Sequence, residues 1–176
     1  MFVRPMTTSD FTLTSPLGAL ESTAAPLLAL TVVWHPDRGR IGEPFIGGAR
    51  GDIVELSRFL PLFMHAGGEG LPLGHGGISR QPLRLVRDAD DAVVMTLPAS
   101  PMVVEVGGRT VSQAVRFSAA QIAEGQILTL GRAVVLCLHW MTRLPLRNAV
   151  PGLQGVGSAA IGVREQIHMV ARTGLP

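Results

Sequence analysis

The sequence contains no lysine, no tyrosine and a single cysteine, and only 16% of its 176 residues are charged. All 15 basic residues are therefore arginine, and the net charge is only +2. These arginines are spread from Arg4 to Arg172 without a run of like charge, which argues against a nucleic-acid-binding arm. The lone Cys137 excludes a disulfide framework, and its apolar run at 133–138 predicts a buried small hydrophobe.

Long hydrophobic runs are also missing, although 47% of the residues are hydrophobic and the mean hydropathy is +0.35. This composition excludes a disordered or collagen-like chain. The two most apolar stretches, 24–34 and 133–138, are too short to span a bilayer. Residues 1–20 alternate apolar and polar positions and have no secretory signal core. We therefore expect a soluble, cytoplasmic protein with no membrane partner.

The first half of the chain predicts short strands after a loose leader. Residues 1–25 are rich in Thr, Ser and Pro and are expected to be flexible. The β-branched and aromatic run 27–34 predicts a buried strand that stops at His35-Pro36. Two shorter strands fit 41–46 and 52–56, and the glycine-rich segment 61–78 predicts a loop.

The second half of the chain predicts three hairpins and one short excursion that is helical or irregular. The hairpins join 83–86 to 92–96, 102–106 to 109–111, and 126–130 to 133–139, and the excursion covers 118–124. About ten short strands separated by close turn signals indicate an all-β protein, an antiparallel β-sandwich of about a hundred residues.

The end of the chain differs in kind. A linker rich in Pro and Gly at 143–157 precedes an amphipathic pattern at 158–171 that predicts a helix. One amphipathic helix cannot bury its apolar face alone. It either packs on the sandwich or begins a second domain that is cut off at Pro176, and we favour the second interpretation.

Three fragments between residues 27 and 140 resemble a forkhead-associated (FHA) domain. They are Val54-Glu55-Leu56-Ser57-Arg58, Ile78-Ser79-Arg80-Gln81-Pro82-Leu83-Arg84-Leu85, and the closing pattern Gln126-Ile127-Leu128-Thr129-Leu130-Gly131-Arg132-Ala133-Val134-Val135-Leu136. The resemblance implies an FHA/SMAD-like sandwich over 26–142 with a short C-terminal helix.

The tail at 152–167, followed by Val170-Ala171, resembles the opening of the AAA+ ATPase domain of sigma-54-dependent transcription activators. The resemblance implies that 158–176 is the helical start of a truncated AAA+ domain in a bacterial regulator. RNA polymerase sigma-54, DNA and ATP would then be partners of the intact parent protein only. The present chain is expected to have no enzyme activity.

The FHA resemblance implies binding of a phosphothreonine-containing protein or peptide. A phosphate dianion needs charge-assisted donors, and Arg58 and Arg80 offer planar guanidinium forks. Ser79 can donate its hydroxyl, and Ser57 lies close enough in sequence to assist. The glycine-rich segment lets backbone approach a ligand closely. The predicted phosphopeptide-binding residues are therefore Arg58, Ser79, Arg80 and Ser57.

The sequence departs from the family pattern at three positions. Pro82 stands where the family has a loop-bracing His, Ser57 where it has Gly, and the segment 98–102 contains no Asn to hold the peptide backbone. One alternative is therefore a phosphate-independent protein-interaction or self-association domain that controls the attached ATPase, and a homo-oligomer is one form that it would take. Another is that Arg58 and Arg80 are surface arginines paired with Glu55 or Asp52, and that Ser79 only caps a turn.

Other chemistries are disfavoured by the patterns around them. The glycine-rich loop is not followed by Gly-Lys-Ser/Thr, so it does not predict a nucleotide site. Asp88, Asp90 and Asp91 lie in turn material, and Ser79 is not in a Gly-x-Ser-x-Gly elbow. The spacing of the potential zinc ligands matches no compact pattern; they are His35, His65, His75, His139 and Cys137. We expect no metal, no cofactor and no catalytic residue.

Overall fold

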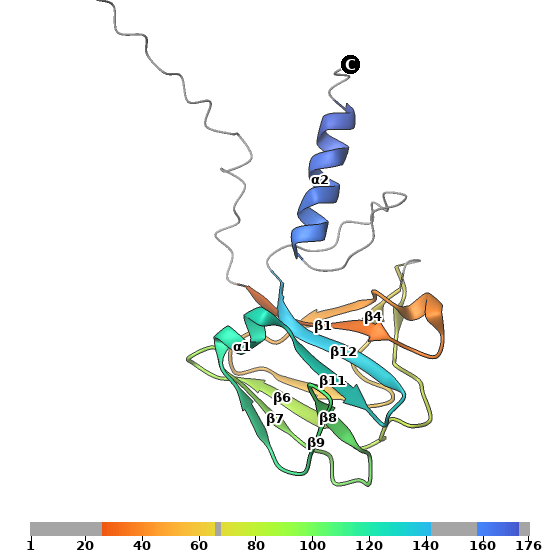
Figure 1. The fold of residues 1–176 in the computed structure, drawn as a ribbon, viewed down its shortest axis with the longest axis vertical. Coiled ribbons are helices and arrows are strands. Elements are labelled where there is room, and N and C mark those ends of the chain that lie inside the picture. Colours follow the sequence, from red (N-terminus) through yellow and green to blue (C-terminus); the bar gives the residue numbers. More distant parts are fainter. Residues whose placement is uncertain (1–25, 66–67, 142–157, 173–176) are drawn as a thin grey trace, which may run out of the picture.

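The computed structural model describes residues 26–65, 68–141 and 158–172. Within these ranges the chain forms a β-sandwich with two α-helices (Figure 1). The strands are β1 Leu27–Trp34, β2 Pro44–Gly47, β3 Ile53–Leu56, β4 Phe63–Met64, β5 Gly70–Leu71, β6 Leu83–Arg87, β7 Val93–Thr96, β8 Val104–Val106, β9 Arg109–Val111, β10 Val115–Phe117, β11 Gln126–Leu130 and β12 Val134–Met141. The helices are a 3-10 turn Arg38–Arg40, α1 Ala119–Glu124 and α2 Ser158–Arg172.

All of the described strand pairs are antiparallel. One sheet has the order β2-β1-β12-β11-β8-β9, and a second has the order β10-β7-β6-β3. The two-residue strands β4 and β5 form a small separate ribbon. The long strands β1 and β12 pair along their whole lengths at the centre of the six-stranded sheet, apart from a bulge between Val32 and Trp34.

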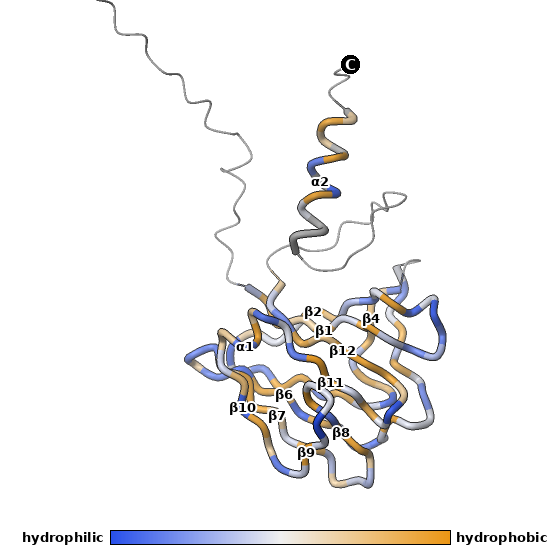
Figure 2. The backbone as a smooth tube through the Cα atoms, viewed as in Figure 1, coloured by the Kyte–Doolittle hydropathy of each residue, from blue (hydrophilic) through white to orange (hydrophobic). Residues whose placement is uncertain are grey.

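The core lies between the two sheets, and period-2 alternation selects the residues that fill it. In β1, Leu28, Leu30 and Val32 are buried against the facing sheet, which contributes Leu83 and Leu85 of β6. Figure 2 shows the apolar positions gathered along these strands. Ile122 of α1 is also fully buried in this cluster and so attaches the helix to the sandwich.

The sandwich class and most of the strands confirm the predictions from sequence. The strand 27–34 and the three hairpins are present within a residue or two of the expected bounds. The excursion at 118–124 is α1, which begins at a capping box between Ser118 and Gln121. A helix is present at 158–172, as the tail pattern predicts. None of the described helices is long and apolar enough to cross a membrane.

Two local predictions were wrong. The strand expected at 41–46 begins only at Pro44, because the 3-10 turn Arg38–Arg40 precedes it. The segment 61–78 is not entirely loop, since Phe63 pairs with Leu71 and Met64 with Gly70. Phe63 is fully buried, so its packing in the core stabilises the β4–β5 ribbon despite the glycines around it. The predicted leader at 1–25 and the predicted linker at 143–157 lie outside the described residues.

Candidate functional site

Arg58 follows β3 and lies beside the loop that carries Ser79. Its backbone N–H donates to the carbonyl oxygen of Ser79 at 2.9 Å, and its own carbonyl accepts from the N–H of Gly74 at 2.9 Å. Two segments that are about twenty residues apart in sequence are thus joined backbone to backbone. The structure brings together the two motifs that the sequence singled out.

The half-buried side chain of Arg58 strengthens the same connection. Its Nε donates to the carbonyl oxygen of Ile78 at 3.1 Å, and its Nη2 donates to the carbonyl oxygen of Gly76. A guanidinium offers five N–H donors, so the Nη1 group remains for a ligand. The family pattern has a bracing His where this chain has Pro82, and here the Arg58 guanidinium holds the loop in shape.

Ser79 is partly exposed and keeps a donor available. Its hydroxyl oxygen accepts the N–H of Gln81 at 2.9 Å, which closes a short turn. Because the hydroxyl only accepts in this bond, its hydrogen is still able to donate to a phosphate oxygen. The turn-capping interpretation and the ligand-binding interpretation are therefore compatible.

Arg80 is exposed, and its guanidinium forms no hydrogen bond or ion pair within the described part of the chain. The alternative partners proposed for Arg58 and Arg80 are engaged elsewhere. Glu55 pairs with Arg84 at 3.1 Å, and an Asp52 carboxylate oxygen accepts the N–H of Ala49 at 2.9 Å. Both arginines of the motif therefore carry a positive charge that no described carboxylate neutralises.

Ser57 is buried in the turn that precedes Arg58. It is 5% exposed, and its hydroxyl oxygen accepts the N–H groups of Phe59 and Leu60 at 3.2 and 3.1 Å. Its N–H also donates to the Leu60 carbonyl. These bonds close the turn that presents Arg58, so Ser57 acts on the site by shaping this turn.

The turn between β11 and β12 packs directly on the Ser79 loop. Gly131 has a φ of +55°, and a Cβ built there would lie 2.0 Å from the carbonyl oxygen of Gly77. Only glycine allows this approach, since any side chain would collide with backbone. Gly131 also donates its N–H to Val103 at 2.8 Å. The Ser79 loop thus has a rigid support on the side of the six-stranded sheet.

Met102 is a site neighbour that the sequence reasoning missed. It ends the segment 98–102, where the family pattern has its Asn, and its sulfur accepts the N–H of Ser79 at 3.2 Å. Thioether sulfur is a weak acceptor. The sequence shows that the segment 98–102 lacks the Asn of the family pattern, but only the fold shows that this segment reaches Ser79.

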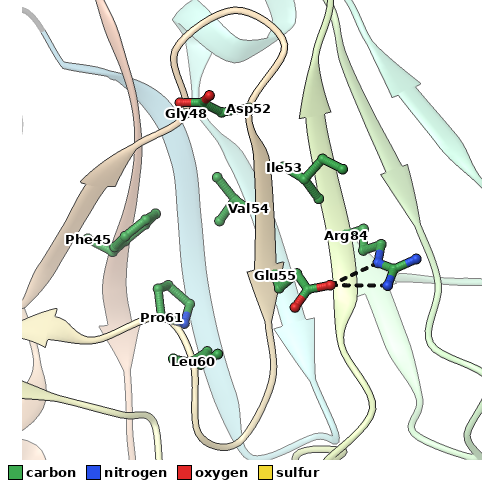
Figure 3. A pocket seen from close by; sticks show the side chains of 9 residues that line it. All are labelled: Phe45, Gly48, Asp52, Ile53, Val54, Glu55, Leu60, Pro61 and Arg84. Carbon is green, nitrogen blue, oxygen red and sulfur yellow. Dashed lines mark hydrogen bonds and ion pairs between the residues drawn. The ribbon is translucent and has the colours of Figure 1, made fainter.

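A hollow of about 600 Å³ lies elsewhere, between the edges of β2 and β3 (Figure 3). Phe45, Val54, Leu60 and Pro61 give it apolar walls, and the ion pair of Glu55 with Arg84 lies at one side. None of Arg58, Ser79 and Arg80 lines this hollow. The candidate site is therefore an open surface formed by loops, as is usual for peptide recognition on a rigid scaffold.

The three aspartates of the β6–β7 turn are held by arginines. Asp91 pairs with Arg50 and Arg87, and Arg116 binds both Asp88 and Asp90. A hydrogen bond from Arg50 is the main cause, and one from Arg87 the second, of a pKa of Asp91 that lies well below its usual range. The ion pairs of these carboxylates favour a structural role over acid–base chemistry.

Among known proteins, matches to the chain are found only with solved structures. No family model matches the chain, and no curated protein does either. The solved structures that are similar to it include two FHA domains. The FHA domain of an Arabidopsis thaliana hypothetical protein is 19% identical with a TM-score of 0.49, covering 66% of this chain and 86% of that chain. The FHA domain of a Chlamydia trachomatis protein is 21% identical with a TM-score of 0.47, covering 64% of this chain and 96% of that chain.

Proposed function

We propose that the sandwich is an FHA-type module that binds phosphothreonine peptides through Arg58, Ser79 and Arg80. The observation that carries this proposal is the joining of the Arg58 turn to the Ser79 loop by backbone and side-chain hydrogen bonds. The two arginines there have no described carboxylate partner. A dianionic phosphate would supply the missing counter-charge.

The donors suit a phosphate in kind as well as in charge. Arg58 retains its Nη1 group, Ser79 its hydroxyl hydrogen, and Arg80 its whole guanidinium. Arg80 is exposed and can turn toward a bound group, whereas Arg58 is held in place by its bonds to loop carbonyls. Arg58 and Ser79 therefore form the preorganised part of the site, and Arg80 adds charge and selectivity.

The wider role that we propose comes from the tail. The segment 152–171 resembles the opening of the AAA+ domain of sigma-54-dependent activators, and α2 occupies 158–172. Phosphopeptide binding would then control an attached ATPase, with sigma-54 polymerase and DNA engaged by the parent protein. The present chain would transmit the signal and hydrolyse nothing.

A second candidate function is a phosphate-independent self-association domain. Two observations favour it. Pro82 stands where the family pattern has a supporting His and the segment 98–102 lacks its Asn, and Leu27 and Ile127 expose apolar side chains on the outer face of the six-stranded sheet. In this case Arg58 would serve only to brace the Ser79 loop.

A phosphothreonine peptide library and its unphosphorylated twin, titrated against the full 176-residue chain, separate the two functions. Wild type is expected to bind only the phosphorylated set. Arg80→Ala and Arg58→Ala are expected to lose that binding, whereas Arg84→Ala, an exposed arginine of β6 paired with Glu55, is the matched control and should retain it. Equal or absent binding to both libraries would refute phosphate recognition.

A further inference from the structure

β3 is an edge strand of the four-stranded sheet. It pairs with β6 on one side, and no segment of the described chain pairs with its other side. Gly51 donates its N–H to the carbonyl oxygen of Arg87 at 2.9 Å, so the backbone groups of Arg87 point toward β3. The next residue, Asp88, donates its N–H to Ala92 and so points toward β7. These bonds fix which residues of β3 face β6.

The free edge of β3 offers two pairs of backbone groups. Direction alternates along an antiparallel strand, so Leu85 of β6 points toward β3 as Arg87 does. Its partner Val54 points back toward β6, and the neighbouring residues Ile53 and Glu55 therefore point away from β6. Their N–H and C=O groups have no backbone partner among the described residues. Donor and acceptor pairs on alternate residues are the groups that another extended strand binds.

Two other strand edges of the sandwich are protected, whereas this one is open. β2 carries Pro44, which has no N–H donor, and β10 carries Arg116, whose guanidinium binds two aspartates of the β6–β7 turn. Proline and charge commonly block edge strands in this way. β3 has no proline, its Ile53 side chain is 60% exposed, and its Glu55 carboxylate is already paired with Arg84. The edge of β3 is therefore suited to accept another strand.

The hollow of about 600 Å³ between β2 and β3 lies along this edge (Figure 3). Its apolar walls come from Phe45, Val54, Leu60 and Pro61. In a strand added to β3, the residue opposite Val54 lies on the same face of the sheet as Val54 and would enter the hollow. The edge thus combines backbone groups that give affinity with a pocket for one side chain, the two elements of recognition by strand addition.

We propose that the free edge of β3 binds an extended, unphosphorylated peptide segment as an additional antiparallel strand. An apolar residue of the segment enters the hollow opposite Val54, a β-branched residue pairs with Ile53, and a basic residue pairs with Glu55. The carboxylates of Asp52 and Glu55 line the hollow against the one guanidinium of Arg84, so charge favours a basic segment. The antiparallel direction is that of the other strand pairs in this sheet. This site goes beyond the proposed phosphopeptide function.

A single extended chain fits this edge better than a second copy of the sandwich does. The Ser57 N–H donates to the Leu60 carbonyl, which folds the segment with Leu60 and Pro61 back beside the end of β3. This segment and β2 form the two sides of the hollow, so the edge lies in a concave surface. A second β3 would bring its own copy of these walls into the same space. One added strand needs only the space beside β3, about 4.8 Å from its neighbour.

Fluorescence anisotropy with the full 176-residue chain tests the proposal. The probe is a labelled, capped peptide, Ser-Lys-Leu-Val-Lys, whose second, third and fourth residues lie opposite Glu55, Val54 and Ile53 in antiparallel pairing. Wild type is expected to bind it. N-methylation of the peptide's Val removes an N–H that would bond to β3 and should lower the affinity about 2- to 10-fold. N-methylation of its Leu, whose N–H points away from β3, is the matched control. Absent binding, or equal binding of the two methylated peptides, would overturn the proposal.

Variants of the protein test the same edge from the other side. Ile53→Pro removes an edge N–H without removing a bond to β6 and should lower the affinity about 2- to 10-fold, whereas Ile53→Val should bind like wild type. Leu60→Glu places a charge in the wall of the hollow and should also weaken binding. Leu62→Glu is its control, because Leu62 is similarly exposed on the same segment but does not line the hollow. A peptide that Ile53→Pro and Leu60→Glu both bind like wild type would lie elsewhere, against the proposal.

Two further arms separate this site from its alternatives. Arg80→Ala should bind the unphosphorylated probe like wild type, whether or not the chain recognises phosphate. A loss of binding in this variant would assign the probe to the Arg58 and Ser79 surface and overturn the proposal. Ile53→Pro should leave the sedimentation velocity of the chain unchanged. A dimer that this variant breaks would make a second copy the occupant of the edge, again overturning the peptide assignment.

Discussion

The backbone N–H of Arg58 donates to the carbonyl oxygen of Ser79 at 2.9 Å, and the Arg58 guanidinium donates to the carbonyls of Gly76 and Ile78 in the same loop. One residue therefore both shapes the loop and offers its remaining N–H groups to a ligand. The planar fork of arginine suits this double role, because its donors diverge in fixed directions.

Replacing Arg58 by lysine should separate charge from shape. Lys keeps the positive charge but cannot donate to two carbonyls in a fixed fork. We expect Arg58→Lys to lose phosphopeptide binding and to speed amide hydrogen exchange at Gly74 and Ile78, whose N–H groups bond within this region. Retained binding with unchanged exchange would show that the fork is dispensable.

Arg80→Ala should affect binding without affecting stability. The side chain is exposed and makes no bond within the described part of the chain, so the free energy of unfolding should change by no more than about 0.5 kcal/mol. A lost charge-assisted hydrogen bond costs about 1.5–3 kcal/mol, so phosphopeptide affinity should fall roughly 10- to 100-fold. Isothermal titration and urea denaturation of the same variant measure the two effects, and a stability loss would contradict the assigned exposure.

Gly131→Ala should destabilise the protein more than Gly107→Ala does. The two glycines have φ values of +55° and +54°, but a Cβ at Gly107 meets nothing within 4 Å, whereas one at Gly131 collides with Gly77. Both variants incur the left-handed strain of about 1–2 kcal/mol, and Gly131→Ala adds about 1–3 kcal/mol of overpacking. Urea unfolding of the pair isolates the contact, and equal losses would contradict it.

His139 predicts a pH dependence of stability. Burial lowers the pKa of its imidazole below the usual 6.5, and the bond to the Trp140 carbonyl only partly opposes this. The unfolded chain then takes up a proton near pH 6.5 while the folded chain does not, so stability falls as the pH drops through 6.5 toward the lowered folded value. The stability difference between wild type and His139→Gln, measured by urea unfolding from pH 8 to pH 5, should shift toward the variant as the pH falls. A constant difference would contradict the burial of this group.

Residue patterns within short segments predicted much of the fold. Alternation in 83–86, turn residues at 87–91 and a β-branched run at 92–96 predict the hairpin that the structure forms with β6 and β7, because the signals lie within one short segment. The excursion at 118–124 was placed but left open between helical and irregular, and the structure shows that the Ser118 capping box begins a helix there. The order of the Arg58 and Ser79 motifs along the chain was likewise sufficient to name candidate donors.

The sequence by itself therefore determined the sandwich class, the hairpins and the residue types of the candidate site. Only the tertiary structure decided what these residues do. The Ser57 hydroxyl accepts hydrogen bonds within its own turn. The Arg58 guanidinium donates to carbonyls of the Ser79 loop, and Met102 and Gly131 contact that same loop. The Ser57 turn is local, but the contacts of Arg58, Met102 and Gly131 join residues 18 to 54 positions apart, and these contacts depend on how the sheets pack. The residue pattern of one segment cannot predict these long-range contacts, because the partner residue lies in another segment of the chain.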